Sequence, residues 1–361
     1  MPDASASYDV AVLGGGPAGS AAAIELAKHG RKVLLLERSL YDEPRIGETF
    51  APQVIPWLRR LGIENLFASV PHVPAPRVVR QWEKPVPVAD PLGFHDEPHG
   101  WHVDRARFDA VLAEVAERAG ATVHRGANAV SSQRRPDDHW DLQFDGKDRR
   151  VQVAARWLID ATGRRSWLLR RVGVRPLLRD RLVGLLGYGG ARASSDPALF
   201  VEATPLGWWY SSPLPGPRSI AAFMTDADLI PRDGRGMAAF WEDQRACSAL
   251  LSRLHGPEVS LRPVVARTSW AGTVSGDGWL AVGEAAMGFD PLLGLGVTLA
   301  LASGWFAARA VLENAPAKYQ SWSEAQFEGY LSRRKNVYGG VTRWPDAPFW
   351  QRRAALGVGV V

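Results

Sequence analysis

The sequence contains a single cysteine, Cys247, which excludes an internal disulfide. Its eight histidines show no metal-ligand spacing, so no metal site is predicted. It also lacks a long apolar run and a leader of the charged-apolar-small kind. We therefore expect a cytoplasmic protein with no membrane partner and no bound metal.

Positive charge is in slight excess. The formal net charge is +5 with a pI near 9.5, and the arginines are spread along the chain, so no nucleic-acid partner is predicted. One dense run allows two interpretations: a solvated helix face, or a docking surface for an acidic protein. The run comprises Arg164, Arg165, Arg170, Arg171, Arg175, Arg179 and Arg181.

A nucleotide-binding unit is predicted near the start of the chain. Tyr8–Leu13 is typical of a buried strand, a glycine turn follows, Ser20–His29 has helical spacing, and Lys32–Leu36 is a second strand. The unit therefore has the strand–turn–helix–strand order of a dinucleotide site.

Hydrophobic residues make up 46% of the sequence, enough for a large core and two joined lobes.

Each glycine of the turn has a separate function in such a site. Gly14 makes the turn, Gly16 lets the backbone approach a pyrophosphate, and Gly19 allows close helix–strand packing. Glu37 ends the second strand, where a carboxylate accepts ribose hydroxyls. Because this carboxylate would repel a 2′-phosphate, the predicted ligand is FAD or NAD rather than NADP.

Further strands are predicted on either side of a hairpin. Asp145-Gly146, between Trp140–Phe144 and Val151–Val153, favours a type I′ turn. Trp157–Ile159 indicates another buried strand, which ends in Asp160-Ala161-Thr162-Gly163. In the middle third, short strands separated by proline and glycine predict an antiparallel sheet in a second lobe. They are Leu182–Gly190, Leu199–Glu202, Gly207–Ser212 and Arg218–Met224.

One of these strands is rich in aromatic residues. Side-chain alternation directs Trp208 and Tyr210 to one face and Trp209 to the other. Two interpretations stay open: core and lobe-interface packing, or a sheet that covers an aromatic substrate pocket.

The chain then returns to the first lobe. Gly278–Val282 predicts a buried strand, and a second glycine turn precedes a long helix from Val297 to Leu312. The helix N-terminus suits a developing negative charge, such as that of a reduced flavin ring. No second Gly-x-Gly-x-x-Gly follows a strand, so no separate nicotinamide domain is predicted.

The residues carry a family resemblance. Residues 14–37, 160–163 and 283–291 together resemble the para-hydroxybenzoate hydroxylase fold, shared by flavin monooxygenases, flavin-dependent halogenases and geranylgeranyl reductases. Four further stretches are similar to the flavoproteins that mature lysine ε-oxidase and glycine oxidase by hydroxylating a tryptophan of the partner enzyme's precursor. These are Arg45–Glu48, Gly100–Asp109, Phe289–Leu292 and Arg343–Arg353.

The resemblance implies an α/β fold in which two domains are interleaved. A Rossmann-type FAD-binding domain would comprise residues 1–70, 101–170 and 271–361. A mainly antiparallel β-sheet substrate domain would comprise residues 71–100 and 171–270.

The resemblance also assigns site residues. Glu48 and Asp290 would be the carboxylates nearest the flavin ring, either catalytic or capping the helices after Pro52 and Pro291. The substrate would lie against Trp208, Trp209 and Tyr210. FAD would be held by Gly14, Gly16, Pro17, Ala18, Gly19, Glu37, Arg38, Arg45, Gly47, Arg107, Asp160, Gly163, Gly283, Glu284, Pro291, Gly294 and Gly296.

The activity implied is that of an FAD monooxygenase. Flavin reduced by NAD(P)H or by a flavin reductase would react with oxygen to a C4a-hydroperoxide, which hydroxylates an electron-rich aromatic ring. The expected substrate is a tryptophan of a partner oxidase precursor. Alternatives are a small or carrier-tethered aromatic, a polyprenyl reductase, and a non-catalytic assembly factor. Halogenation is disfavoured because Lys84, the only candidate for the lysine that handles hypohalous acid, lies in a stretch (Trp82–Pro85) that does not match the halogenases.

Overall fold

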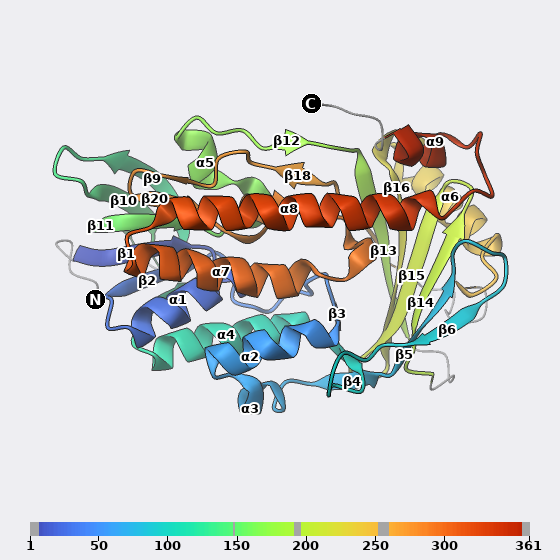
Figure 1. Ribbon diagram of the computed structural model, residues 1–361, viewed down its shortest axis with the longest axis horizontal. Coiled ribbons are helices and arrows are strands. Elements are labelled where there is room, and N and C mark those ends of the chain that lie inside the picture. The colour runs from blue at the N-terminus through green and yellow to red at the C-terminus, as the bar shows by residue number, and fades with distance from the viewer. Residues whose placement is uncertain (1–6, 147–148, 191–195, 252–259, 356–361) are drawn as a thin grey trace.

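The computed structural model describes residues 7–146, 149–190, 196–251 and 260–355. It has an α/β fold with one mainly parallel and one mainly antiparallel sheet, as predicted (Figure 1). Among the described residues no helix is both long and apolar enough to span a bilayer.

The first sheet is built around β1 (Ser7–Leu13), five of whose seven residues are buried. Its parallel strands follow the order β20-β11-β1-β2-β8, and β9 and β10 extend it as an antiparallel ribbon. The bounds are β2 (Val33–Glu37), β8 (Thr122–Arg125), β9 (Asn128–Arg134), β10 (Trp140–Asp145), β11 (Arg150–Asp160), β19 (Ser275–Gly276) and β20 (Trp279–Ala281).

Two details of this sheet differ from the prediction. The two strands expected at 151–153 and 157–159 form one strand, β11, whose first half pairs with β10 and whose second half pairs with β1. The hairpin itself is confirmed, but Asp145 pairs with Arg150 and the Gly146 amide donates to the Arg149 carbonyl, so Asp145 and Gly146 are not the two central residues of the turn. Residues 147–148 of that connection lie outside the described part of the chain.

The second sheet has seven strands in the order β17-β13-β16-β15-β14-β5-β6, and the four strands predicted for the middle third are at its centre. Strand β5 joins from the 71–100 segment by pairing parallel to β14. The bounds are β5 (Arg77–Gln81), β6 (Val88–Pro91), β13 (Leu182–Gly190), β14 (Leu199–Thr204), β15 (Gly207–Leu214), β16 (Arg218–Asp226) and β17 (Ser260–Val265). The domain borders themselves stay a prediction.

Two small sheets lie between the large ones. One has the order β3-β7-β4 and the other β12-β18-β21. The bounds are β3 (Thr49–Phe50), β4 (His72–Ala75), β7 (Gly100–Val103), β12 (Leu177–Leu178), β18 (Ser269–Trp270) and β21 (Met287–Gly288).

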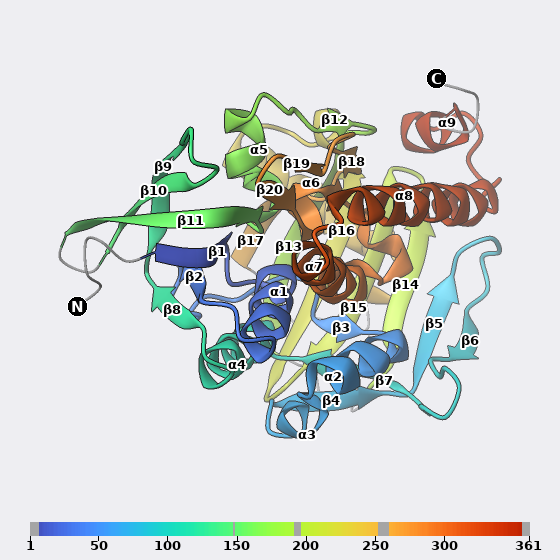
Figure 2. The same cartoon turned by 60° about the vertical axis from the view of Figure 1, so that its left-hand side comes forward.

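Helices cover the parallel sheet, and α8 extends along both lobes (Figures 1 and 2). Near one end of α8, Tyr319 donates to the carbonyl of Ala281 in β20; near the other, the Tyr338 hydroxyl accepts from Trp208 in β15. The bounds are α1 (Pro17–Lys28), α2 (Ile55–Leu61), α3 (Glu64–Phe67), α4 (Arg105–Arg118), α5 (Trp167–Arg171), α6 (Gly234–Ala246), α7 (Gly296–Leu312), α8 (Pro316–Gly339) and α9 (Pro348–Ala355).

The arginine run does not lie on one helix face. Helix α5 has only five residues, and the chain continues through a turn into β12. Arg164 precedes α5 and turns inward, where it donates to the carbonyls of Arg267 and Phe289. The solvated-helix interpretation is therefore wrong for the run as a whole.

Candidate cofactor and substrate site

The first glycine turn is packed on one side and open on the other. A side chain at Gly14 would overlap the carbonyl oxygen of Ala161, and one at Gly19 would overlap that of Gly14. Gly14 also has φ +112°, which favours glycine. Gly16 differs, because an added Cβ there would meet no atom within 4 Å. The backbone at the start of α1, where Pro17 is the first helical residue, is therefore accessible to a phosphate group.

Asp160 supports this turn from behind. Its buried carboxylate accepts hydrogen bonds from the amides of Thr162 (3.0 Å), Leu168 (2.7 Å) and Leu169 (3.1 Å). Burial raises the pKa of Asp160, and these hydrogen bonds only partly offset it. Asp160 thus fixes the segment that contacts Gly14, and Gly163, two residues beyond that contact, is half-buried.

Glu37 is held at the end of β2 by several donors. Its carboxylate accepts from the amides of Gly15 (2.7 Å) and Ser39 (2.9 Å), and Arg45 lies 3.1 Å away. Burial acts to raise the pKa of Glu37, but the Ser39 hydrogen bonds and the charge of Arg45 outweigh it, so the pKa is lowered. Glu37 is therefore a fixed anion, and the adjacent Arg38 is exposed.

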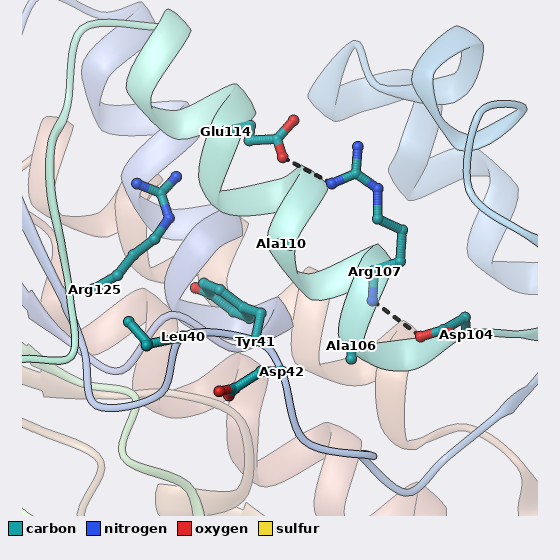
Figure 3. A pocket seen from close by; sticks show the side chains of 9 residues that line it. All are labelled: Leu40, Tyr41, Asp42, Asp104, Ala106, Arg107, Ala110, Glu114 and Arg125. Carbon is teal, nitrogen blue, oxygen red and sulfur yellow. Dashed lines mark hydrogen bonds and ion pairs between the residues drawn. The ribbon is translucent and has the colours of Figure 1, made fainter.

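A cleft of about 460 Å³ lies between residues 40–42 and the first turns of α4 (Figure 3). Tyr41 forms one wall and donates its hydroxyl to the carbonyl of Gly15 (2.9 Å). Arg107, predicted to approach the pyrophosphate, lines this cleft but pairs with Glu114 on its own helix (3.0 Å). Its approach to a pyrophosphate stays a prediction.

The turn at Gly283–Ala285 contacts the first glycine turn. The amide of Gly283 donates to the Ser303 hydroxyl (2.8 Å), and an added Cβ at Gly283 would press against Ala18 at 2.8 Å. Glu284 is half exposed and forms an ion pair with Arg164 (2.8 Å). Glu284 is thus a charged side chain that remains accessible where the two turns meet.

The turn before α7 leaves its backbone uncovered. Pro291, Gly294 and Gly296 are exposed, and an added Cβ at either glycine would meet no atom within 4 Å. Helix α7 packs closely on α1, because Gly304 lies against the carbonyl of Ala18. At 1.5 Å per residue, Gly296 is about 12 Å from this contact along α7. Accessible backbone therefore occurs both at the start of α1 and at the start of α7, as the binding of an extended dinucleotide requires.

Glu48 lies where the two lobes meet. Its carboxylate is buried and accepts from the Gly47 amide and the Tyr188 hydroxyl, both at 2.9 Å. An added Cβ at Gly47 would lie 3.8 Å from Val297, so this turn adjoins the first turn of α7. Burial raises the pKa of Glu48. Glu48 makes no cap at the helix after Pro52, so the capping interpretation is wrong for it.

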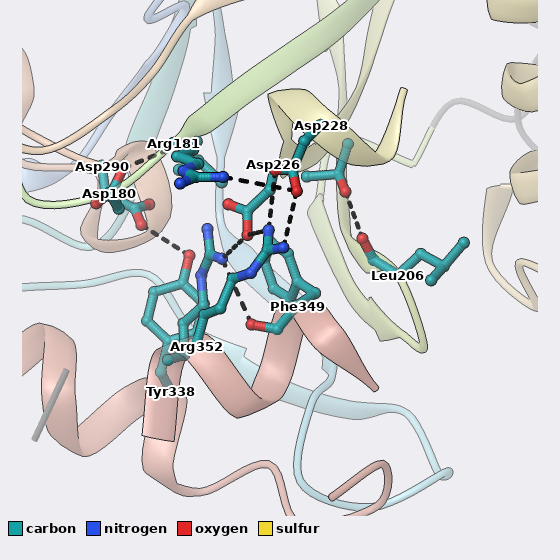
Figure 4. A network of polar contacts seen from close by, with 12 residues as sticks. Asp180, Arg181, Leu206, Asp226, Asp228, Asp290, Tyr338, Phe349 and Arg352 are labelled. Carbon is teal, nitrogen blue, oxygen red and sulfur yellow. Dashed lines mark hydrogen bonds and ion pairs between the residues drawn. The ribbon is translucent and has the colours of Figure 1, made fainter. Parts of the chain in front are cut away.

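Asp290, by contrast, is a helix cap. Its carboxylate accepts from the hydroxyl of Tyr338 (2.7 Å; Figure 4). It also accepts from the amide of Leu292 (3.0 Å) and from Arg334 Nε (3.2 Å). Arg334 also binds Asp180 at 2.9 Å. The capping interpretation is confirmed for Asp290, whose oxygens are occupied by the chain itself.

The aromatic strand divides between the two faces of its sheet as predicted. Trp209 is fully buried against Trp241 on one face, and Trp208 is buried on the other. Tyr210 is half buried on the face of Tyr188; burial raises the pKa of its hydroxyl, and the charge of Glu48 adds to the effect. Core packing therefore describes the two tryptophans, whereas Tyr210 is the aromatic residue nearer Glu48.

Two site residues were not singled out from the sequence. Arg105 is buried, pairs with Asp109 and donates to the carbonyls of Ile46 and Gly47. Its i, i+4 spacing from Asp109 was a visible signal. Tyr188 lies 140 residues from Glu48, and no local pattern joins them.

The chain matches known proteins over nearly its full length. Residues 9–175 match the family model for FAD dependent oxidoreductases. A putative FAD-dependent oxidoreductase, LodB, of Marinomonas mediterranea is 30% identical and covers 97% of this chain and 98% of its own. The chain belongs to the FAD-dependent oxidoreductases. A pyrrole-2-carbonyl-[peptidyl-carrier protein] chlorinase of Pseudomonas fluorescens is 25% identical over 93% of this oxidoreductase and 82% of its own chain.

Solved structures agree with the fold of the oxidoreductase. The flavin-dependent halogenase CmlS superposes with a TM-score of 0.85 and 24% identity, covering 96% of this chain and 67% of its own. QhpG, described as a peptidyl tryptophan dihydroxylase essential for tryptophylquinone cofactor biogenesis, superposes at 0.78 with 26% identity, over 96% and 79%. The open backbone at Gly16, Gly294 and Gly296 fits the FAD that this family binds.

Proposed function

We propose that this oxidoreductase is a monooxygenase that hydroxylates an electron-rich aromatic ring, a tryptophan side chain of a partner protein. The observation that carries the proposal is the buried Glu48, which lies between the open turn before α7 and the tyrosines of the antiparallel sheet. The similarity to LodB along the whole chain and to the peptidyl tryptophan dihydroxylase QhpG supports a protein-borne tryptophan.

The residues around this position match the needs of aromatic hydroxylation. FAD, when bound, supplies the oxygen-activating chemistry. The N-termini of α1 and α7 favour the negative charge of its phosphates and reduced ring. Glu48 takes up the proton lost from the substrate ring, and Tyr188 holds the carboxylate in place by its hydrogen bond. Tyr210 provides an aromatic surface for the substrate.

Halogenation receives less support. Of the described lysines, Lys84 is exposed in the connection between β5 and β6, and Lys28 and Lys318 are engaged by the Leu61 carbonyl and by Glu313. None of these three lines the turn before α7. A second candidate function is oxygenation of a carrier-tethered small aromatic, which the similarity to the pyrrolyl-carrier chlorinase favours. NAD(P)H or a flavin reductase is proposed as the electron source.

The test is co-expression with the precursor of a quinone-type oxidase encoded nearby, followed by intact-mass measurement of that partner. The expected mass gain is one oxygen atom per hydroxylation: one atom of O₂ enters the ring, the other leaves as water, and the reductant supplies two electrons. The gain should be lost with Glu48→Gln. A chlorine mass on the partner, or oxidation of a carrier-bound aromatic with the partner unchanged, would instead favour the second candidate.

A further inference from the structure

The short strand β12 exposes two consecutive leucines. Leu177 is 59% and Leu178 is 55% exposed, although neighbouring residues of a strand point to opposite faces. Neither face of β12 is therefore covered. Within the described part of the chain, β12 pairs only with β18 and ends its sheet, so its outer edge has no strand partner.

Arginines without carboxylate partners flank this strand. Arg164 and Arg181 pair with Glu284 and Asp228. In the residues that the structure describes, no Asp or Glu pairs with the remaining members of the run, and Arg179 Nε is buried without a hydrogen-bond partner. We call the surface formed by the two leucines and the arginines on either side of them the β12 edge. Its members are Arg175, Leu177, Leu178 and Arg179.

An unpaired edge with exposed apolar side chains is normally blunted or covered, because it readily accepts another strand. Here the charges that lack a partner are positive, since Asp180 is paired with Arg334; this favours an acidic strand and repels a basic one. We propose that the β12 edge binds an extended segment of the partner protein, in which acidic and apolar residues alternate, by strand addition.

The position of the edge suits this role. Asp180, two residues after Leu178, binds Arg334, which in turn binds the Asp290 cap of the turn before α7. A single buried ion-pair network would therefore connect a docked partner's binding site to the turn before α7. The inference rests on the proposed function, because it concerns how the same site receives its protein substrate.

A binding experiment tests the edge separately from catalysis. The probe is a short fluorescein-labelled peptide in which glutamate alternates with leucine, titrated with the intact FAD-loaded protein by fluorescence anisotropy. Leu178→Ser and Arg175→Glu should each weaken binding about tenfold or more, because the first removes apolar surface buried by the peptide and the second places a like charge opposite its glutamates. Added salt should weaken it further. A peptide with lysine in place of glutamate should not bind.

Strand β6 provides the matched control. It is also the end of a sheet and carries an exposed valine, Val88 (45% exposed), but its neighbour Arg80 is paired with Asp90. Val88→Ser should leave peptide binding unchanged. Equal weakening by Val88→Ser and Leu178→Ser, or no binding of the acidic peptide, overturns the proposal. So does concentration-dependent dimerisation that Leu178→Ser abolishes, because a second copy would then occupy the edge.

The same variants separate the two proposals. If the partner gains oxygen with the parent protein but only slowly with Leu178→Ser and Arg175→Glu, both proposals stand. If these variants modify the partner at the parent rate, the docking proposal fails and the proposed function remains. If the acidic peptide binds at β12 and no partner is oxidised, the proposed function fails and the docking surface remains.

Discussion

At the scale of single residues, the glycines of the site differ in what surrounds them. Gly16 has an extended backbone (φ −73°, ψ −177°) that valine adopts without strain, and its added Cβ meets no protein atom. Gly14 has neither property. Substitution at Gly16 therefore acts on the ligand, while the same change at Gly14 acts on folding.

Gly16→Val should abolish FAD retention while changing the free energy of unfolding of the apoprotein by less than about 1 kcal/mol. The added side chain occupies the space that the pyrophosphate needs. The measurement is the flavin-to-protein absorbance ratio after desalting, with apoprotein melting as the stability check. Gly234→Val, at an open glycine that starts α6, is the control and should keep FAD. Normal FAD content in Gly16→Val would disprove the cofactor placement.

Glu48 gives a prediction about pH. Burial raises the pKa of this carboxylate, and a base acts only when deprotonated, so hydroxylation should rise with pH through that raised pKa. Glu48→Gln should remove this rise of the rate with pH and lower the rate by about 10²–10⁴-fold. Tyr188→Phe should move the rise to a different pH and keep most of the activity. A parallel pH profile for Glu48→Gln and the parent would exclude Glu48 as the base.

At the scale of elements, α8 is anchored by a buried ion pair. Arg334 is 4% exposed and is shared by Asp180 and Asp290. Arg334→Met should cost about 3–5 kcal/mol of unfolding free energy, because two buried carboxylates lose their counter-charge. Urea denaturation measures this, with the exposed Arg333→Met on the same helix as a control expected within about 0.5 kcal/mol. Similar losses of unfolding free energy in both variants would show that the ion pairs of Arg334 do not anchor α8.

Sequence patterns predicted the elements better than the contacts between them. The βαβ unit, the four middle strands and α7 follow from local periodicity and turn residues, which the chain carries within short windows. The bond between Tyr188 and Glu48 spans 140 residues, and that between Arg334 and Asp290 spans 44. Such contacts depend on how α8 and β13 are placed in space, and no spacing in the sequence records this.

At the scale of the whole molecule, His102 joins the lobes. Its Nε2 donates to the carbonyl of Pro197 (2.8 Å), which precedes β14, and its Nδ1 accepts from the Thr49 hydroxyl (2.9 Å). The Pro197 carbonyl can only accept, so Nε2 carries a hydrogen, and in the neutral ring Nδ1 is then the acceptor. Burial lowers the pKa of His102 to about 4.

Acid should therefore weaken the junction. Below about pH 6.5 the unfolded chain binds a proton at His102, whereas the folded chain does not. The contribution of His102 to the free energy of unfolding is therefore complete above that pH and is lost toward pH 4, by up to about 3 kcal/mol. Urea midpoints at pH 7.5 and 4.5 measure the loss, and His102→Gln should reduce the difference between them. Identical pH slopes for His102→Gln and the parent would contradict this assignment.

Helix α8 has a consequence for cooperativity. It is bonded to the parallel sheet through Tyr319, to the cofactor turn through Arg334 and to the antiparallel sheet through Tyr338. Neither sheet can lose its structure without uncovering a buried face of the same helix. Heat should therefore melt the two lobes together in one calorimetric transition, so a destabilising change in the substrate lobe would also release the cofactor.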